Sequence, residues 1–153
     1  MTESHSQGTR PGYKEPQEIR EIPLTALLEN VQRMQASGWR LVQICCTRLA
    51  SDHEVNYSFD RGPLAREDSP APAVIPSEAP MPADQPPSFV TLRVRLPLEK
   101  PELPSISSFY WSAFLYENEM HDLFDVSVKG MAVDFHGKLY TTAVPAPYTR
   151  KDV

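Results

Sequence analysis

The sequence predicts an α+β domain in two layers, with helices packed on one face of a small, mainly antiparallel sheet. Three observations support this prediction: an amphipathic helical pattern near the N-terminus, three strand-like segments, and an aromatic-rich helical stretch at residues 109–124. The length of 153 residues suits one domain. We therefore expect a single hydrophobic core between the sheet and the helices.

The expected domain organisation follows from composition. Residues 1–20 are polar and contain glycine and proline, which is typical of a disordered leader. The folded domain is expected over residues 21–144, and residues 145–153 form a proline-containing tail. Within the domain, residues 61–87 are expected to be a flexible, proline-rich insertion.

The first helix is expected to begin at Ile22 and Pro23, since proline is tolerated in a first helical turn. Gly38 supplies the left-handed residue that commonly ends a helix, and Trp39 could fold back on its last turn. Apolar residues at helical spacing predict one buried stripe, formed by Leu24, Leu27, Leu28, Val31 and Met34.

Three strands are expected, with a further extended segment near the C-terminus. Residues 40–49 are apolar on both faces, which favours a central or covered position in the sheet. After a turn at 51–53, residues 55–60 and 90–96 alternate apolar and polar side chains, as half-buried antiparallel neighbours do. A short strand or extended arm is expected at 138–144.

The segment at 61–87 contains half of the chain's 16 prolines, and they stand at positions 63, 70, 72, 76, 80, 82, 86 and 87. Proline lacks an amide donor and has a fixed φ, so neither helix nor sheet can persist there. A solvated insertion or flexible tether is the favoured interpretation, and a docking strip for a partner is the alternative. Deleting residues 64–86 is expected to leave folding intact.

Charge and cysteine content exclude several functions. The net charge of −5 does not suit nucleic-acid binding, which needs a basic face. The two cysteines, Cys45 and Cys46, are adjacent and cannot hold an iron–sulfur cluster, so we expect two small core residues in a reducing cytoplasmic setting. No apolar run approaches the length of a membrane-spanning helix, so any membrane association is expected to come through partners.

Residues 109–124 carry both the aromatic side chains and the densest group of acids. The residue types of an acid–base or metal site are present at Glu117, Glu119, His121, Asp122 and Asp125, but all come from three turns of one helix. No glycine-rich phosphate loop is present. We therefore expect no catalytic, cofactor-binding or metal-binding residues in this chain.

Two interpretations of the acids remain open. In the first, they pair with basic residues of this chain, such as Arg93 or Arg95, or cap backbone amides. In the second they form a subunit interface, in which Glu117, Glu119 and His121 meet a neighbouring subunit while Asp122 and Phe124 fix the helix against the sheet.

Residues 117–124, Glu-Asn-Glu-Met-His-Asp-Leu-Phe, follow Pro-Ser-Ile-Ser-Ser at 104–108. This pattern resembles the signature of the 30-kilodalton subunit family of respiratory complex I: Pro-Ser-Ile-Thr, an aromatic run, then Glu-Arg-Glu-x-x-Asp-Leu-Phe-Gly. Asn118 stands in place of the arginine and Asp125 in place of the glycine. With Asp-Phe-His-Gly-Lys-Leu-Tyr at 134–140, the pattern is most similar to the small cofactor-free subunit (D) of Ech-type energy-converting, membrane-bound nickel–iron hydrogenases.

The resemblance implies a non-catalytic structural subunit that braces the large subunit in a peripheral arm, and it favours the interface interpretation. The nickel–iron centre and iron–sulfur clusters would belong to partner subunits, which transfer electrons between ferredoxin and protons and couple this to ion translocation. The implied partners are the hydrogenase large subunit, iron–sulfur subunits and integral-membrane subunits. The chain itself would be cytoplasmic and peripheral to the cell membrane.

Two alternatives remain. The first is the equivalent 30-kilodalton subunit of an NADH–quinone oxidoreductase, which the same resemblance would allow. The second is a small metal-dependent hydrolase that uses Glu117, His121 and Asp122.

Overall fold

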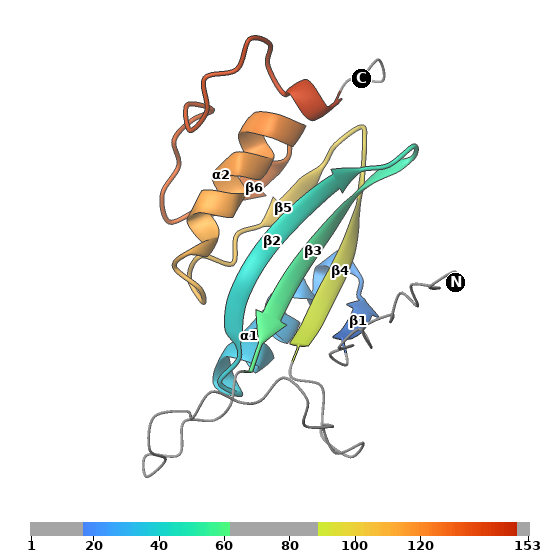
Figure 1. The fold of residues 1–153 in the computed structure, drawn as a ribbon, viewed down its shortest axis with the longest axis vertical. Helices are drawn as coiled ribbons and strands as arrows, with labels where there is room; N and C mark the ends of the chain where they lie inside the picture. Colours follow the sequence, from blue (N-terminus) through green and yellow to red (C-terminus); the bar gives the residue numbers. More distant parts are fainter. Residues whose placement is uncertain (1–16, 62–88, 150–153) are drawn as a thin grey trace, which may run out of the picture.

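The computed structural model describes residues 17–61 and 89–149 and shows two helices packed against a mixed sheet (Figure 1). Four strands form the sheet in the order β1 (Gln17–Glu21), β4 (Phe89–Pro97), β3 (Asp52–Asp60) and β2 (Arg40–Arg48). β1 pairs in parallel with β4, and the other two pairings are antiparallel. The predicted α+β architecture is confirmed.

Two α-helices and four short elements complete the described structure. The 3-10 helix η1 (Leu24–Ala26) leads into α1 (Leu27–Ala36), and the second helix is α2 (Ala113–Phe124). A separate two-stranded parallel sheet pairs β5 (Glu102–Pro104) with β6 (Ser127–Lys129) and so joins the chain on either side of α2. The 3-10 helix η2 (Pro147–Thr149) follows an irregular segment.

The first predicted helix is confirmed, with its buried stripe at Leu27, Val31 and Met34. Leu28 is 38% exposed and does not belong to the stripe. Gly38 adopts φ +77° after the last turn, and the Trp39 amide donates to the carbonyl of Met34 at 3.0 Å. This pattern is the left-handed glycine ending that the sequence indicated.

Strands β3 and β4 provide the sheet face that the helices cover. Val55 lies opposite Val94, Tyr57 opposite Leu92 and Phe59 opposite Val90, and all six side chains are at most 1% exposed. The predicted antiparallel pairing is therefore confirmed. The period-2 alternation of both strands produces this apolar face because every second residue points the same way.

The other sheet face carries a network of charged residues. Arg95 bonds Glu54 at 3.0 Å and Asp52 at 3.2 Å, and Arg93 bonds Asn56 at 3.0 Å. These arginines therefore find their partners on β3 and, through Glu21, on β1, and not among the acids of α2.

The expectation of a central or covered position for residues 40–49 is wrong. β2 is an edge strand, and its pairing register shifts between Leu41 and Gln43. This bulge lets Leu41 and Ile44 both reach the core while the intervening Val42 stays 44% exposed. An apolar run on both faces therefore arises here from a bulge and not from burial on two sides.

The boundary of the folded part also needs correction. Gln17–Glu21 forms β1, so the last residues of the predicted 1–20 leader belong to the sheet. A five-residue edge strand has little sequence signal, because its stability comes from pairing with β4. The rest of the predicted leader, residues 62–87 of the predicted insertion and the last four residues of the tail lie outside the described residues.

Of the two forms expected at 138–144, a short strand or an extended arm, the strand is wrong, since this stretch is irregular in the structure. Extended pairing occurs earlier, at β6, where Val128 lies opposite Leu103 of β5. Gly130 and Gly137 adopt positive φ, of +80° and +73°, at bends after β6. No helix within the described ranges is long and apolar enough to cross a membrane.

The two adjacent cysteines lie in different environments, one buried and one exposed. Cys46 is buried beneath the helices, and burial raises the pKa of its thiol to about 12. Cys45 points to the opposite face and is exposed, so the prediction of two core cysteines holds only for Cys46.

A neutral maleimide is therefore expected to label the native protein once, at Cys45, because the thiolate is the reacting species and Cys46 is both inaccessible and protonated. Intact-mass spectrometry with peptide mapping measures this. The Cys45→Ser variant should stay unlabelled under native conditions and gain one label in urea. Equal labelling rates at both positions would contradict the burial of Cys46.

Candidate functional site

The aromatic stretch forms a helix that is shorter than predicted. α2 begins at Ala113, and the residues before it form two turns, at 107–109 and 111–112. The amides of Phe109 and Tyr110 both donate to the carbonyl of Ile106, at 2.9 and 3.0 Å. The aromatic residues before the helix therefore sit on a tight turn whose conformation depends on side chains of α2.

Glu117 holds that turn. Its side chain is fully buried, and its carboxylate accepts the Ile106 amide at 2.7 Å and the Ser105 hydroxyl at 2.7 Å. The chain of hydroxyls continues from Ser105 to Ser107 at 2.7 Å, and Ser107 accepts the Ala132 amide at 2.9 Å. One carboxylate thus connects the segment before α2 with the segment after β6.

Burial raises the pKa of Glu117 above its ordinary value of 4.5, while the Ser105 hydroxyl and the Ile106 amide act in the opposite direction. No basic side chain in the described part of the chain is bonded to this carboxylate. Glu117 is therefore a buried acid held by neutral donors.

The raised pKa makes stability depend on pH. Above pH 4.5 the unfolded chain loses the Glu117 proton first, so the free energy of unfolding falls as pH rises towards the folded-state pKa. The test is urea unfolding of the wild type and of Glu117→Gln over this pH range. We expect the free energy of unfolding of the variant, relative to that of the wild type, to increase as pH rises. A difference that stays constant with pH would contradict the raised pKa.

Asn118, which stands where the resembling family has arginine, is also fully buried. Its amide donates to the carbonyls of Phe114 at 2.7 Å and Val133 at 2.8 Å, and its oxygen accepts the Phe135 amide at 2.8 Å. We name residues 131–149 the C-terminal arm. Asn118 fastens the first part of this arm to α2.

Asp122 fastens the arm a second time, one turn further along α2. Its carboxylate accepts the Tyr140 amide at 2.9 Å and lies 3.2 Å from Nδ1 of His121. The arm approaches closely here, since a Cβ on Gly137 would lie 3.4 Å from the His121 ring. Glycine therefore suits position 137 for two reasons: the backbone there has a positive φ, and a side chain would crowd the His121 ring.

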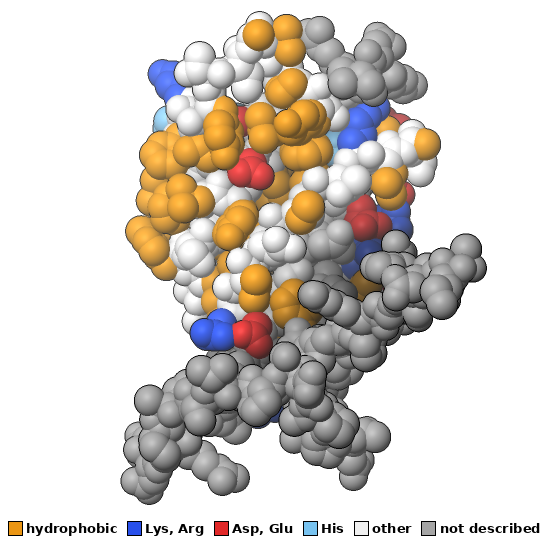
Figure 2. Space-filling view, viewed as in Figure 1, with side chains coloured by type: hydrophobic (Ala, Val, Ile, Leu, Met, Phe, Trp, Pro, Cys, Tyr) orange, Lys and Arg blue, Asp and Glu red, His pale blue; other side chains and the backbone are white. Residues whose placement is uncertain are grey.

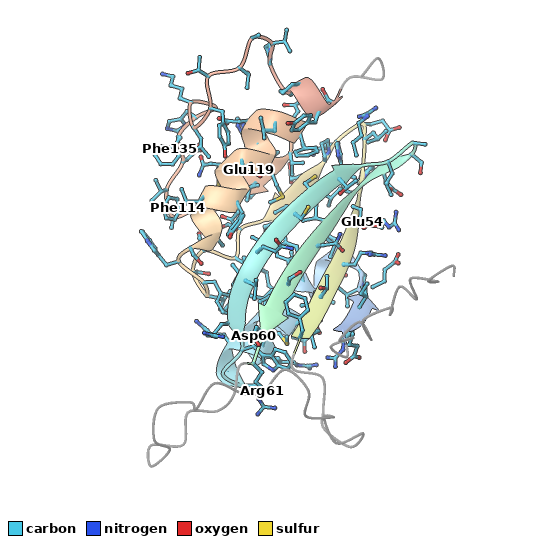
Figure 3. All side chains as sticks on the ribbon, in the orientation of Figure 1. Glu54, Asp60, Arg61, Phe114, Glu119 and Phe135 are labelled. Carbon is cyan, nitrogen blue, oxygen red and sulfur yellow. The ribbon has the colours of Figure 1, made fainter. Side chains whose placement is uncertain are left out.

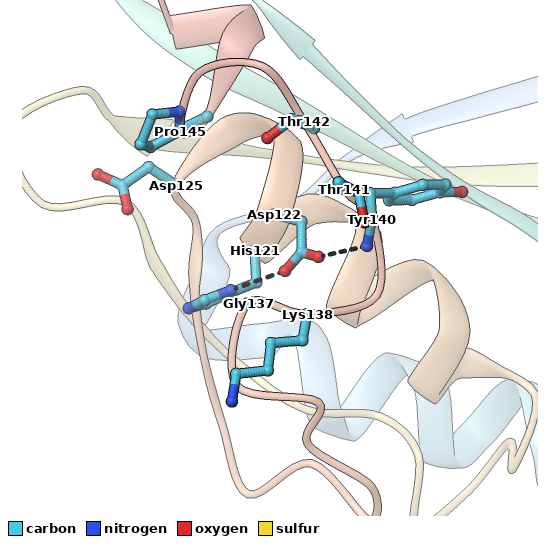
Figure 4. Close-up of a pocket in the computed structure, with 10 residues that line it drawn as sticks. His121, Asp122, Asp125, Gly137, Lys138, Tyr140, Thr141, Thr142 and Pro145 are labelled. Carbon is cyan, nitrogen blue, oxygen red and sulfur yellow. Dashed lines mark hydrogen bonds and ion pairs between the residues drawn. The ribbon is translucent and has the colours of Figure 1, made fainter.

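A pocket of about 440 Å³ lies between the C-terminal end of α2 and the arm (Figure 4). Its walls come from α2, its C-cap and the arm, and they include His121, Asp122, Asp125, Lys138, Thr141 and Thr142. The Asp122 carboxylate is already used by Tyr140 and His121, as the dashed lines in Figure 4 show.

Phe124 lies between the sheet and the end of the chain. Its ring contacts His53 of β3 edge-on, with centroids 6.1 Å apart, and packs on Tyr148 of η2 at 5.2 Å. The turn predicted around His53 is wrong at that residue, which is a buried strand residue with a pKa lowered mainly by desolvation.

The outward side of α2 and the arm together expose a surface that we name the outward patch. Its members are apolar except for one acid, and they are Trp111, Phe114, Leu115, Glu119, Phe135 and Tyr140. Trp111 is 64% exposed and Leu115 is 47% exposed. Aromatic rings connect across it, from Trp111 to Phe114 at 5.4 Å and from Phe114 to Phe135 at 6.3 Å. Figure 2 shows hydrophobic side chains gathered over this side of the molecule.

The five predicted interface residues thus divide into two groups. Glu117 and Asp122 use their carboxylates within the chain and bond backbone amides, as the first interpretation described. Glu119, His121 and Phe124 are partly exposed. The participation of all five in a subunit interface stays a prediction.

The hydrolase alternative required Glu117, His121 and Asp122 at one centre. Glu117 is buried against Ile106, whereas His121 and Asp122 line the pocket beside the arm. Over residues 17–61 and 89–149, no group of three or more His, Cys, Asp or Glu side chains is placed to hold a metal ion.

Asp125 replaces the glycine of the resembling signature and still forms the expected turn. It adopts φ +57° and ψ +32° as the C-cap of α2, and its amide donates to the carbonyl of His121 at 3.2 Å. Aspartate tolerates this left-handed conformation better than most residues but less well than glycine.

We expect Asp125→Gly to raise the free energy of unfolding by about 0.5 kcal/mol and Asp125→Val to lower it by about 1 kcal/mol or more, because a β-branched residue is strained at positive φ. Urea unfolding measures both variants. The reverse order would contradict the left-handed cap.

The fold and the α2 site define a class of protein, a small α+β domain in which acids of one helix bond the domain's own backbone. The family model for the 30-kilodalton subunit of respiratory-chain NADH dehydrogenase matches residues 22–134, and the chain belongs to this family. No curated protein matches the sequence.

Two solved structures share the fold. A chain in the membrane-bound sulfane sulfur reductase (MBS), an archaeal respiratory membrane complex, is 17% identical with a TM-score of 0.63; the match covers 86% of this chain and 68% of that one. A trypsin-resistant fragment of Nqo5 is 21% identical with a TM-score of 0.55, over 77% of this chain and 83% of the fragment.

Sequence reasoning missed the role of Asn118. The sequence did mark it as a departure from the family signature, but spacing along a helix gives no information about the Val133 and Phe135 backbone that it binds. Ser105 and Ser107 were missed for the same reason, since their partners are Glu117 and the Ala132 amide.

Proposed function

We propose that this chain is a non-catalytic structural subunit of a complex I-like, energy-converting nickel–iron hydrogenase. It braces the large subunit in the peripheral arm, while partner subunits hold the nickel–iron centre and the iron–sulfur clusters and carry out electron transfer and ion translocation. The chain holds no cofactor and reaches the cell membrane only through its partners.

The observation that carries the structural role is the outward patch on α2. An exposed cluster of Trp111, Leu115 and Phe135 is costly to leave in water and is typical of a surface that another protein covers. The patch includes the outward side of the helix whose buried acids, Glu117 and Asp122, hold the flanking segments in place. These carboxylates thus prepare a rigid surface for a partner.

Affinity purification of a tagged chain from its native membranes in mild detergent tests the proposal. The expected result is co-purification of a large subunit, iron–sulfur subunits and integral-membrane subunits, with stoichiometric nickel and iron in the complex. A chain recovered alone after gentle extraction would overturn the proposal.

The alternative is the 30-kilodalton subunit of an NADH–quinone oxidoreductase, and the matching family model and the likeness to Nqo5 favour it. The same purification separates the two functions. Flavin and NADH-oxidising subunits without nickel would indicate the dehydrogenase. A neighbouring gene for a large subunit with two Cys-x-x-Cys pairs would indicate the hydrogenase.

A further inference from the structure

One carboxylate lies within the outward patch. Trp111, Leu115 and Glu119 follow one another at spacings of four residues, which places Leu115 and Glu119 one above the other on the solvent side of α2. Figure 3 shows Glu119 on α2 with Phe114 and Phe135 nearby. The Tyr140 hydroxyl donates to Glu119 at 2.9 Å from the arm.

The charge of Glu119 is not neutralised within the described part of the chain. The Tyr140 hydroxyl is its one bonded partner there, and no lysine, arginine or histidine forms an ion pair with it. Glu117 and Asp122, in contrast, have their hydrogen-bonding capacity used by the chain's own amides. Glu119 is therefore the acid of the signature left with capacity for an external cation.

We propose that the outward patch binds an apolar surface of a partner subunit that carries one basic side chain, and that this side chain pairs with Glu119. The inference rests on the proposed function, because it assumes that a partner covers α2. Covering the patch removes water from the carboxylate, and a buried carboxylate without a counter-charge opposes binding. Charge complementarity therefore requires a cation at this point.

The side chains around Glu119 favour arginine over lysine as that cation. The Tyr140 ring presents an aromatic surface beside the carboxylate, and a guanidinium can stack on such a ring while it bonds the carboxylate. A second copy of this chain fits the patch poorly. A twofold contact centred on it would bring two Glu119 carboxylates together.

The test compares variants of the tagged full-length chain in its native host. Glu119→Lys reverses the charge, Glu119→Gln removes it at constant shape, and Leu115→Asp disrupts the apolar part. Glu29→Lys on α1 is the matched control, since Glu29 is exposed and lies on a different helix. Circular dichroism and urea unfolding of each purified chain show whether the fold is kept.

We expect Glu119→Lys to lower the yield of co-purified partner by roughly 30-fold or more, with Glu119→Gln intermediate and the Glu29→Lys control unchanged. A photo-crosslinker at position 115 should then identify a partner peptide with an arginine or lysine. Exchange of that residue for glutamate should restore binding to Glu119→Lys.

The outcomes separate the two proposals. If Glu119→Lys retains the partner while Leu115→Asp loses it, the patch is an interface but the ion pair is overturned. If both variants retain the partner, the inference about the patch is overturned and the proposed function stands. If the wild-type chain brings no partner, the proposed function and the inference fail together.

Discussion

Replacing Glu117 with alanine is expected to lower the free energy of unfolding by about 3 kcal/mol. The change leaves the buried Ile106 amide and the Ser105 hydroxyl without their acceptor, and each unsatisfied buried donor costs roughly 1–3 kcal/mol. It also opens space in a core where Glu117 is fully buried. Urea unfolding of the purified chain, followed by circular dichroism, measures the loss.

Glutamine at 117 is the matched variant, because it keeps the shape. Its carbonyl oxygen can accept the Ile106 amide, and its NH₂ group can donate to Ser105. We expect a loss of about 1 kcal/mol or less near neutral pH, since the cost of burying a carboxylate disappears. Equal losses for alanine and glutamine would show that the hydrogen bonds of this site do not stabilise the fold.

The second large effect is expected for Asn118→Asp, which changes one atom type and almost no volume. The Asn118 amide nitrogen donates to two carbonyls, at 2.7 and 2.8 Å. A carboxylate oxygen in that place would face both carbonyl oxygens without a proton, in a fully buried site. We expect a loss of about 3–4 kcal/mol in the free energy of unfolding at neutral pH.

The control for this change is Asn30→Asp on α1. Asn30 donates a single bond, to the carbonyl of Ala26 at 2.8 Å, and is only partly buried, so a loss of about 1 kcal/mol is expected. Hydrogen exchange adds a local measurement: the Phe135 amide should exchange faster in Asn118→Asp than in Asn30→Asp. Similar losses for the two variants would show that Asn118 does not fasten the arm.

Much of the fold could be predicted from local pattern. Helical spacing predicted the stripe of Leu27, Val31 and Met34. Alternation of apolar and polar residues predicted the strands at 55–60 and 90–96. Such repeats depend on neighbours in sequence, so the sequence contains all the information they need. Family membership was likewise predictable, because the acidic signature at 117–124 is a local string.

Whether a strand lies at the edge or in the centre of the sheet, in contrast, depends on pairing between segments that are distant in sequence. β1 adds to the sheet beside β4, more than 70 residues later in the chain, and this parallel pairing leaves β2 at an edge. The bulge at Leu41 then gives β2 its two-faced apolar pattern. No local repeat specifies either feature, since both arise from hydrogen bonds across the sheet.

The sequence by itself determined the α+β class, the buried stripe of α1 and the concentration of acids on one helix. Only the tertiary structure decided that Glu117 faces inward and Glu119 outward. α2 carries apolar residues on all its sides, so spacing places each acid on a face without showing which face is buried. The inward direction of Glu117 follows from its bond with the buried amide of Ile106, and the outward direction of Glu119 follows from its bond with the exposed Tyr140. Each acid lies where its hydrogen-bond donor is.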